Sequence, residues 1–278
     1  IHLDGEYHLQ TGAVTAQAIV SHVQVPLPGD GNGEVGVNAE LALAGSFDRK
    51  TGKLDVSVAA RTADLAWREW KAHVLDFDTE LTEQGAQIHA FSARVGEGAM
   101  TAAGSVGFDG TYALHGRLAS LEVAPLSSFA GEPVSGSLSG QYEVQGHGSV
   151  FSAKTRTRIE GLRVRGTEVA EASGVILVDG RRLTLQDYVI QMPQGQHRIN
   201  GTVDANREDP VLALTVTTDN VRLEPLLKLS GLDQKVQATG NLTNHMEIGG
   251  TVSHPRVSGA VHLSDGSAMG YLVAGVSG

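Results

Sequence analysis

Apolar residues recur at every second position through most of this chain, and this period constrains the fold more than any other feature. It runs through residues 54–58, 75–81, 212–216, 242–248 and 257–263, and most fully through Val35, Val37, Ala39, Leu41 and Leu43. Successive side chains of a β-strand point to opposite faces, so a period of two predicts strands with one apolar and one polar face. The chain is therefore expected to be all-β.

Short segments rich in Asp, Asn and Gly separate the alternating runs. They are Asp48–Gly52, Asp109–Gly110, Asp179–Gly180, Asn206–Pro210 and Ser264–Gly266. Such residues reverse the chain because they supply positive φ angles and local side-chain hydrogen bonds. Strands joined by turns at spacings of roughly 8–15 residues predict a mainly antiparallel sheet.

Helical periodicity is confined to short stretches. The expected helices are Leu223–Leu229, in which Pro225 suits a first turn, and Pro125–Ala130. Asp64–Lys71, which carries two Trp residues three positions apart, is expected to be strand.

A sequence unit of about a hundred residues recurs along the chain. Ser120–Leu126 resembles Asn220–Leu226, which lies 100 residues later, and Ser21–Leu27 lies about as far before it. An alternating run led by Gly follows each of the three. Divergent repeats of this kind predict an elongated structure in which each unit mainly contacts its neighbours.

We therefore expect residues 1–278 to form a single continuous segment of a longer protein. Its repeat units are roughly 1–45, 46–146 and 147–250, and residues 251–278 begin the next. The chain begins at Ile1 rather than Met, so any membrane anchor is expected outside it.

Composition excludes several classes of protein. The 21 basic residues face 31 acidic ones, for a net charge of −10, which counts against binding of nucleic acid. The absence of Cys excludes disulfides, thiolate chemistry and Cys-based zinc sites. No apolar run approaches the roughly 18 residues of a membrane-spanning helix.

No constellation of catalytic or ligand-binding residues emerges, and we expect neither an enzyme nor a metal or cofactor site. Residues 31–36 fit G-x-G-x-x-G, but an alternating strand follows them where a dinucleotide site needs a helix. Residues 30–41 imitate a calcium loop, but Val35 stands where the sharp turn requires Gly. His245, His254 and His262 lack the spacing of a zinc site and are expected on the sheet surface.

The candidate binding surface is the apolar face itself. An apolar side chain left in water costs about 1.5–3 kcal/mol, so this face requires a cover. If the sheet curls into an open groove, hydrocarbon chains can cover it, and frequent Gly permits the necessary bends and bulges. A closed core, as in a sandwich or solenoid, is the alternative. The expected groove-lining residues are Val37, Leu41, Leu43, Val56, Val58, Phe77, Leu81, Val106, Phe108, Leu138, Tyr142, Val144, Leu183, Leu185, Leu212, Leu214, Val216, Leu242, Met246, Ile248, Val261 and Leu263.

The last third of the chain resembles a known family. The segment Gly249-Gly-Thr-Val-Ser-His-Pro-Arg-Val-Ser-Gly-Ala-Val-His-Leu-Ser-Asp-Gly-Ser267 resembles the recurring G-T-x-x-x-P-x-v-x-G-x-l-x-l-x-D-G unit of the TamB family, within the AsmA-like superfamily. Leu223–Gly231, leading into Gly240, is similar to the connector between sheet stretches of that family. The specific part of the resemblance covers about residues 212–270.

The resemblance implies a long sheet folded lengthwise into an open groove, or β-taco, with an apolar interior. It implies a parent protein that is anchored in the inner membrane of a diderm bacterium, crosses the periplasm and has membranes at both ends. The implied function is the conduction of phospholipid, held by its acyl chains, and the support of outer-membrane biogenesis with a barrel-assembly partner. The family has no catalytic residues to carry over.

Two other functions are open to such a chain. A scaffold or chaperone would bind strands of outer-membrane proteins at its sheet edges by β-augmentation. A surface adhesin or β-solenoid would instead seal its apolar face into a core.

Overall fold

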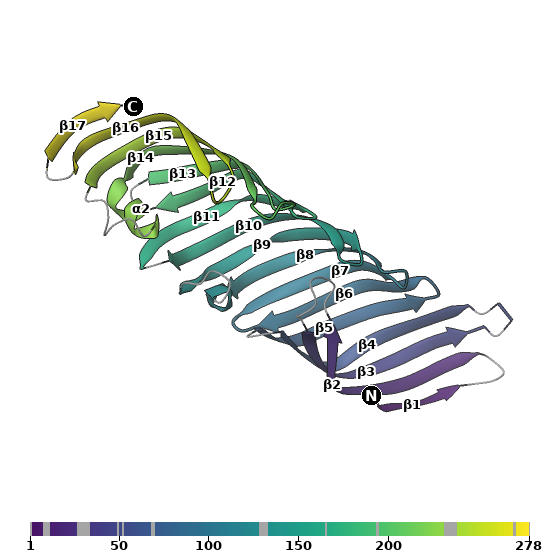
Figure 1. The fold of residues 1–278 in the computed structure, drawn as a ribbon. Helices are drawn as coiled ribbons and strands as arrows, with labels where there is room; N and C mark the ends of the chain where they lie inside the picture. Colours follow the sequence, from purple (N-terminus) through teal and green to yellow (C-terminus); the bar gives the residue numbers. More distant parts are fainter. Residues whose placement is uncertain are drawn as a thin grey trace. The chain divides into compact units, whose positions relative to one another are not determined.

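A computed structural model gives the fold. It describes residues 2–7, 12–26, 34–48, 50–51, 53–67, 70–127, 133–164, 166–192, 195–230, 238–268 and 271–277. Nearly all of these residues lie in strands, which confirms the expected all-β, mainly antiparallel class (Figure 1). The strands are β1 His2–Tyr7, β2 Ala13–Pro26, β3 Glu34–Phe47, β4 Leu54–Trp67, β5 Trp70–Thr82, β6 Gly85–Val95, β7 Gly98–Gly107, β8 Thr111–Glu122, β9 Val134–His147, β10 Val150–Val164, β11 Thr167–Asp179, β12 Arg182–Met192, β13 Gly195–Asp204, β14 Val211–Arg222, β15 Ala238–Gly250, β16 Pro255–Ala268 and β17 Tyr271–Ser277.

Two compact units divide the chain. Unit 1 comprises Ile1–Leu121 with Gly140–Ala153, and unit 2 comprises Glu122–Ser139 with Lys154–Gly278. In unit 1 each strand from β1 to β7 pairs antiparallel with the strand that follows it. In unit 2 the same holds from β11 to β16. Each unit is thus a meander, in which strands adjacent in the sequence are adjacent in the sheet (Figure 1).

Glycines placed against a neighbouring backbone help to bend the strands. Gly104 has a φ of 138°, and a Cβ there would lie 2.0 Å from the carbonyl oxygen of Ala113 on β8. Gly201 repeats this arrangement in unit 2, with a φ of 129° and a distance of 2.0 Å to the carbonyl oxygen of Ala213. Only Gly adopts such a backbone without strain, so these positions let the sheet curl as the high Gly content predicts.

A short helical element follows β8 and β14 at matching places. Ser120 and Asn220 have φ values of 52° and 48°, unusual for residues other than Gly. The chain then enters the 3-10 helix η1 (Ala124–Leu126) in one case and the helix α2 (Leu223–Ser230) in the other. The helix predicted at Leu223–Leu229 is confirmed. The one predicted at Pro125–Ala130 is confirmed only at its start, since its end lies outside the described residues.

The strand predicted for Asp64–Lys71 is confirmed at both of its ends, which belong to two paired strands, whereas residues 68–69 lie outside the described residues. Trp67 ends β4 and Trp70 begins β5, and the two residues are partners in the register. The turns predicted at Asp109–Gly110 and Asn206–Pro210 lie between strands, and that at Asp179–Gly180 begins with the last residue of β11. The turn predicted at Asp48–Gly52 also lies between strands, and its residues 49 and 52 lie outside the described residues.

The turn predicted at Ser264–Gly266 is wrong. These residues lie within β16, where Asp265 has a φ of 50°. The register moves from the pair Thr239–Ser267 to the pair Asn241–Ser264, so two residues of β16 face the single Gly240. An Asp-Gly pair with positive φ accommodates a β-bulge as readily as a reversal, and the continuing ladder on both sides selects the bulge.

Strand bounds recur between the two units. β5, β6 and β7 start at 70, 85 and 98, and β11, β12 and β13 start 97 residues later, at 167, 182 and 195. Their ends show the same offset. The recurrence has the length expected of the predicted repeat and supports it, although the repeat itself stays a prediction.

Replacement of Gly201 by Ala tests the role of the glycine bends. We expect Gly201→Ala to lower the free energy of unfolding by about 1–3 kcal/mol, because Ala is strained at this φ and its Cβ would meet the carbonyl oxygen of Ala213. Gly249→Ala is the matched control, since the nearest atom to a Cβ there is 3.9 Å away and φ is not in the left-handed region. Urea unfolding of both variants measures the difference. Equal losses would show that the bend does not depend on Gly.

Candidate functional site

The register gathers the predicted lining residues of unit 1 on one face of the sheet, here called the apolar face. Leu43 pairs with Val58, and Val56 pairs with Leu81, which pairs in turn with Ala86 of β6. The row continues from Ala86 through Val106 on β7 to Tyr112 on β8. The predicted residues that this register places on the apolar face of unit 1 are Val37, Leu41, Leu43, Val56, Val58, Phe77, Leu81 and Val106.

Small buried residues form the floor of this face. Ala63, Val74 and Ala93 lie on three successive strands and make up a buried cluster. Phe77 and Phe91 pack against the cluster, with their rings edge-to-face and their centroids 6.4 Å apart. The floor is thus closely packed although larger side chains above it keep contact with solvent.

Tyrosines cover glycines on the apolar face at β8 and β9. The hydroxyl of Tyr142 donates to the carbonyl oxygen of Thr101, 2.9 Å away, and stands over Gly116. Tyr112 stands over Gly146 in the same way. Aromatic rings that pack over glycines restore the packing that the missing side chains leave open. Tyr142 therefore lies on the face that the sequence predicts, and Val144 follows it by two residues on β9.

Phe108 lies elsewhere. It follows β7 in the turn toward β8 and is 69% exposed. Its position is at the end of the strands rather than along the apolar face, because β7 stops at Gly107.

In unit 2 the register again gathers the predicted residues on one face. Leu185 pairs with Gly201, then Leu214 and Ile248 follow on β14 and β15. Val216 pairs with Met246, and Leu242 with Leu263. The predicted residues on the apolar face of unit 2 are Leu183, Leu185, Leu212, Leu214, Val216, Leu242, Met246, Ile248, Val261 and Leu263. Leu138 is half-buried on β9.

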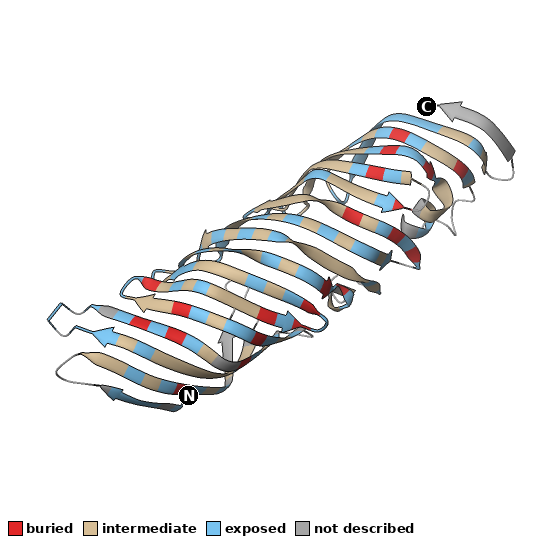
Figure 2. Ribbon diagram, turned by 180° about the vertical axis from the view of Figure 1, so that it is seen from behind, coloured by how far each residue is buried: buried red, intermediate tan, exposed pale blue. Residues whose placement is uncertain are grey.

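On the apolar faces of both units, the buried side chains are mostly small. Among the described residues, the buried hydrophobic side chains are Ala and Val, apart from Leu121 and Met192. The large predicted residues, including Leu43, Leu81 and Leu214, are only half-buried. Figure 2 shows this as strands that alternate between exposed and intermediate residues, with few buried ones. In a closed core the largest apolar side chains are the most buried, so the apolar face lacks such a core within the described residues.

One polar row crosses the apolar face of unit 2, and sequence analysis missed it. His197 on β13 pairs with Thr218 on β14, which pairs with Asn244 on β15. These residues are 6%, 1% and 5% exposed, so they are buried more deeply than the leucines around them. The sequence signal was a polar residue at an apolar place in each alternating run: Thr218 continues the run of Leu214 and Val216.

Hydrogen bonding in this polar row is incomplete. Nδ1 of His197 and Oγ1 of Thr218 are 2.8 Å apart and share one hydrogen bond. Nε2 of His197 and Oδ1 of Asn244 are buried and have no partner among the described residues. Burial lowers the pKa of His197 below its ordinary value, because a charged imidazole would lose its hydration.

Helix α2 lies close to this row. It contacts both β11 and β15, which flank β12, β13 and β14 in the sheet of unit 2. Leu223 and Leu227 are half-buried and Lys228 is exposed, so the helix turns one apolar side toward the strands. Helix α2 therefore packs against the sheet of unit 2 close to where β14 ends.

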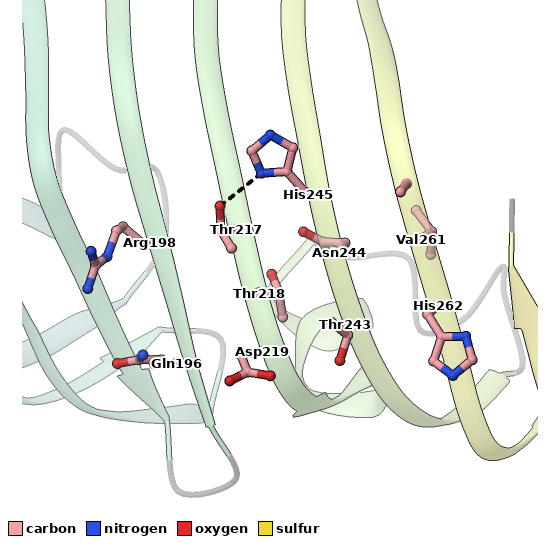
Figure 3. A pocket seen from close by; sticks show the side chains of 11 residues that line it. Gln196, Arg198, Thr217, Thr218, Asp219, Thr243, Asn244, His245, Val261 and His262 are labelled. Carbon is pink, nitrogen blue, oxygen red and sulfur yellow. Dashed lines mark hydrogen bonds between the residues drawn. The ribbon is translucent and has the colours of Figure 1, made fainter.

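The opposite face of the same strands is polar. Arg198, Thr217 and His245 form a row across it, and Oγ1 of Thr217 lies 3.3 Å from Nδ1 of His245 (Figure 3). Together with Gln196 and Asp219 they line an open depression of about 650 Å³, which Thr218, Asn244 and Val261 also border (Figure 3). The polar face also carries exposed ion pairs such as that of Arg158 with Glu171 on the next strand, and such pairs contribute little stability individually.

The histidines expected on the sheet surface are exposed, as His245, His254 and His262 all show. No group of three metal-ligating side chains occurs in the part of the chain that the structure describes. The described helices also include none with the length and hydropathy needed to cross a membrane.

Comparison with known proteins identifies no relative. No family model, no curated protein and no solved structure matches the chain.

The buried imidazole predicts a dependence of stability on pH. Because the pKa of His197 is lowered from 6.5, below that pH the unfolded chain binds a proton that the folded chain does not. The contribution of His197 to the free energy of unfolding is therefore fully present above pH 6.5. It is lost as the pH falls toward the pKa of the folded state, by at most about 1.4 kcal/mol per pH unit.

We expect His197→Gln to remove this contribution, whereas Thr218→Val, which keeps the imidazole, retains it. Urea unfolding between pH 5.5 and 7.5 measures it. If wild type and His197→Gln lose stability in parallel on acidification, the buried imidazole does not titrate as described.

Proposed function

We propose that this chain is a segment of a periplasmic TamB/AsmA-like protein that conducts phospholipid along its apolar face. In this proposal the parent protein is anchored in the inner membrane of a diderm bacterium and carries lipid toward the outer membrane. There it supports outer-membrane biogenesis with a barrel-assembly partner. The chain itself is not an enzyme in this proposal and needs no cofactor.

One observation carries the proposal: large apolar side chains line one face of each unit and stay half-buried. Leu43 and Leu214 are examples, whereas the buried residues around them are mostly Ala and Val. Exposed apolar surface of this extent is unfavourable in water at about 25 cal/mol per Å². A lipid acyl chain offers the non-directional apolar contact that would cover it.

The repetition of apolar side chains along the face suits a moving ligand. Leu185, Leu214 and Ile248 present hydrocarbon on three strands of one row, and the polar row at His197 is the exception described for unit 2. Dispersion contacts with such a surface change little as a chain slides by one strand, because each site resembles the next. The polar face, with its ion pairs and net acidic composition, keeps the protein compatible with water.

The glycine bends support the same function. Gly104 and Gly201 permit the sheet to bend, and a sheet bent toward its apolar face would offer a concave surface to a lipid. The alternative of a sealed core needs a second layer over this face. The described elements other than strands are η1 and α2, which are too short to supply one.

Charge placed on the apolar face tests the proposal. We expect Leu43→Arg in unit 1 and Leu214→Arg in unit 2 to reduce the phospholipid recovered with the purified protein at least several-fold, because a guanidinium among acyl chains loses its hydration. The matched controls are Ala44→Arg and Ala213→Arg, which place the same charge one residue away on the exposed face. Lipid extraction with mass spectrometry measures the recovered phospholipid, and circular dichroism checks folding.

Two results would contradict lipid conduction. The first is wild-type protein that carries no phospholipid and accepts none from vesicles. The second is equal lipid recovery from the apolar-face and polar-face variants, which would place any bound lipid elsewhere.

A further inference from the structure

The polar row of unit 2 is out of place on an apolar face. His197, Thr218 and Asn244 follow one another across β13, β14 and β15. Apolar rows lie on both sides of it along the strands: Val216 and Met246 on one side, Val221 and Leu242 on the other. Buried polar atoms are normally satisfied, so Nε2 of His197 and Oδ1 of Asn244, which have no partner among the described residues, require an explanation.

The fold does not demand polarity at this row. Strand β7 of unit 1 has the same length as β13 and starts 97 residues earlier, and the counterpart of His197 there is Met100. Met100 pairs with Leu118, as His197 pairs with Thr218. Unit 1 therefore builds the equivalent part of its sheet from two apolar side chains, and packing alone does not account for the imidazole and hydroxyl of unit 2.

We propose that His197, Thr218 and Asn244 form a polar station that binds the glycerol–ester region of a diacyl lipid while its acyl chains lie on the neighbouring apolar rows. This inference rests on the proposed lipid conduction and assigns to it the place where the polar end of the lipid is held.

The two unpartnered atoms, Nε2 of His197 and Oδ1 of Asn244, indicate which groups a ligand must offer. The hydrogen bond with Thr218 engages Nδ1 of His197, which leaves Nε2 to donate or accept according to the tautomer. Asn244 presents an acceptor, Oδ1. The ester oxygens of any diacyl lipid can accept from Nε2, whereas a donor for Oδ1 of Asn244 is supplied only by the free hydroxyl of a diacylglycerol, because the third oxygen of a phospholipid's glycerol is bonded to phosphorus.

The neutral state of the row favours this region of the lipid over the phosphate. Burial lowers the pKa of His197, so the imidazole is uncharged at neutral pH. Thr218 and Asn244 carry no charge either. A phosphate group is bound most strongly by Arg or Lys, and the nearest such side chain in the register, Arg198, is on the opposite face.

Entry of the ligand requires α2 to shift. The two unpartnered atoms are not accessible to solvent, and α2 contacts β15, which carries Asn244, and β11, which lies two strands from β13 and His197. The helix has only eight residues, and helices of this length are marginal without their packing contacts. Displacement of α2 by a lipid exchanges one apolar cover for another and supplies the missing hydrogen bonds.

The test uses variants that copy unit 1. His197→Met with Thr218→Leu installs the Met–Leu pair that unit 1 carries, so folding is expected to be retained. Asn244→Leu is a second, independent variant, and Thr217→Leu, on the exposed face of the same strand, is the matched control. The probes are dihexanoylglycerol, dihexanoyl phosphatidylethanolamine and n-octane, and calorimetry of the whole chain measures their affinity.

We expect the double variant to bind both ester lipids about two- to tenfold more weakly than wild type, since the one hydrogen bond from Nε2 of His197 to the lipid is lost. Octane, which has no polar group, is expected to bind all variants equally. Addition of dihexanoylglycerol to wild-type protein labelled with ¹⁵N in histidine is expected to shift the Nε2 resonance of His197, and Thr217→Leu is expected to leave the shift unchanged.

Each contrary result has a definite meaning. Equal affinity of wild type, the double variant and Asn244→Leu for the ester lipids, or an unmoved Nε2 resonance, overturns the station while lipid conduction stands. Dependence on the row for the phospholipid but not for dihexanoylglycerol overturns the assignment to the glycerol region. Failure of all three probes to bind wild type removes the proposed function, and the station with it.

Discussion

The structure depends on one constraint, the coupling between a period of two in the sequence and the antiparallel register of a meander. Alternation gives each strand an apolar and a polar face, and the register aligns these faces across neighbouring strands. In unit 1 this alignment runs from Leu43 and Val58 to Val106 and Tyr112. A slip of one residue in any strand would turn its leucines to the opposite face. The candidate lipid surface therefore exists only in this register.

Glycine and bulges reconcile this alignment with a bent sheet. At Gly201 the backbone approaches a neighbouring carbonyl oxygen more closely than any Cβ permits. At Asp265 an extra residue is absorbed within β16 without loss of the flanking ladder. Both devices keep apolar residues on one face while the strand changes direction, which a strictly regular strand does not achieve.

The small and the large side chains of the apolar face differ in burial. The floor, typified by Ala63 and Ala93, is small and closely packed, whereas the larger side chains stand above it half in contact with solvent. The polar row at His197 is the exception, because polar atoms are buried there beside α2 with part of their hydrogen-bonding capacity unused. The contrast with Met100 and Leu118 in unit 1 makes this row a specific feature of unit 2 rather than a consequence of its fold.

The sequence by itself determined the all-β class, the assignment of residues such as Leu43 and Leu214 to one face, and the helix at Leu223, because alternation and the placement of Pro225 act over a few residues. The tertiary structure decided what depends on partners distant in the chain. It made Asp265 a bulge instead of a turn, placed Phe108 beyond the end of β7, and brought His197, Thr218 and Asn244 into one row. Local sequence patterns do not specify which strands become neighbours or in which register they pair. Only that pairing decides whether three polar residues that are distant in the sequence share a site.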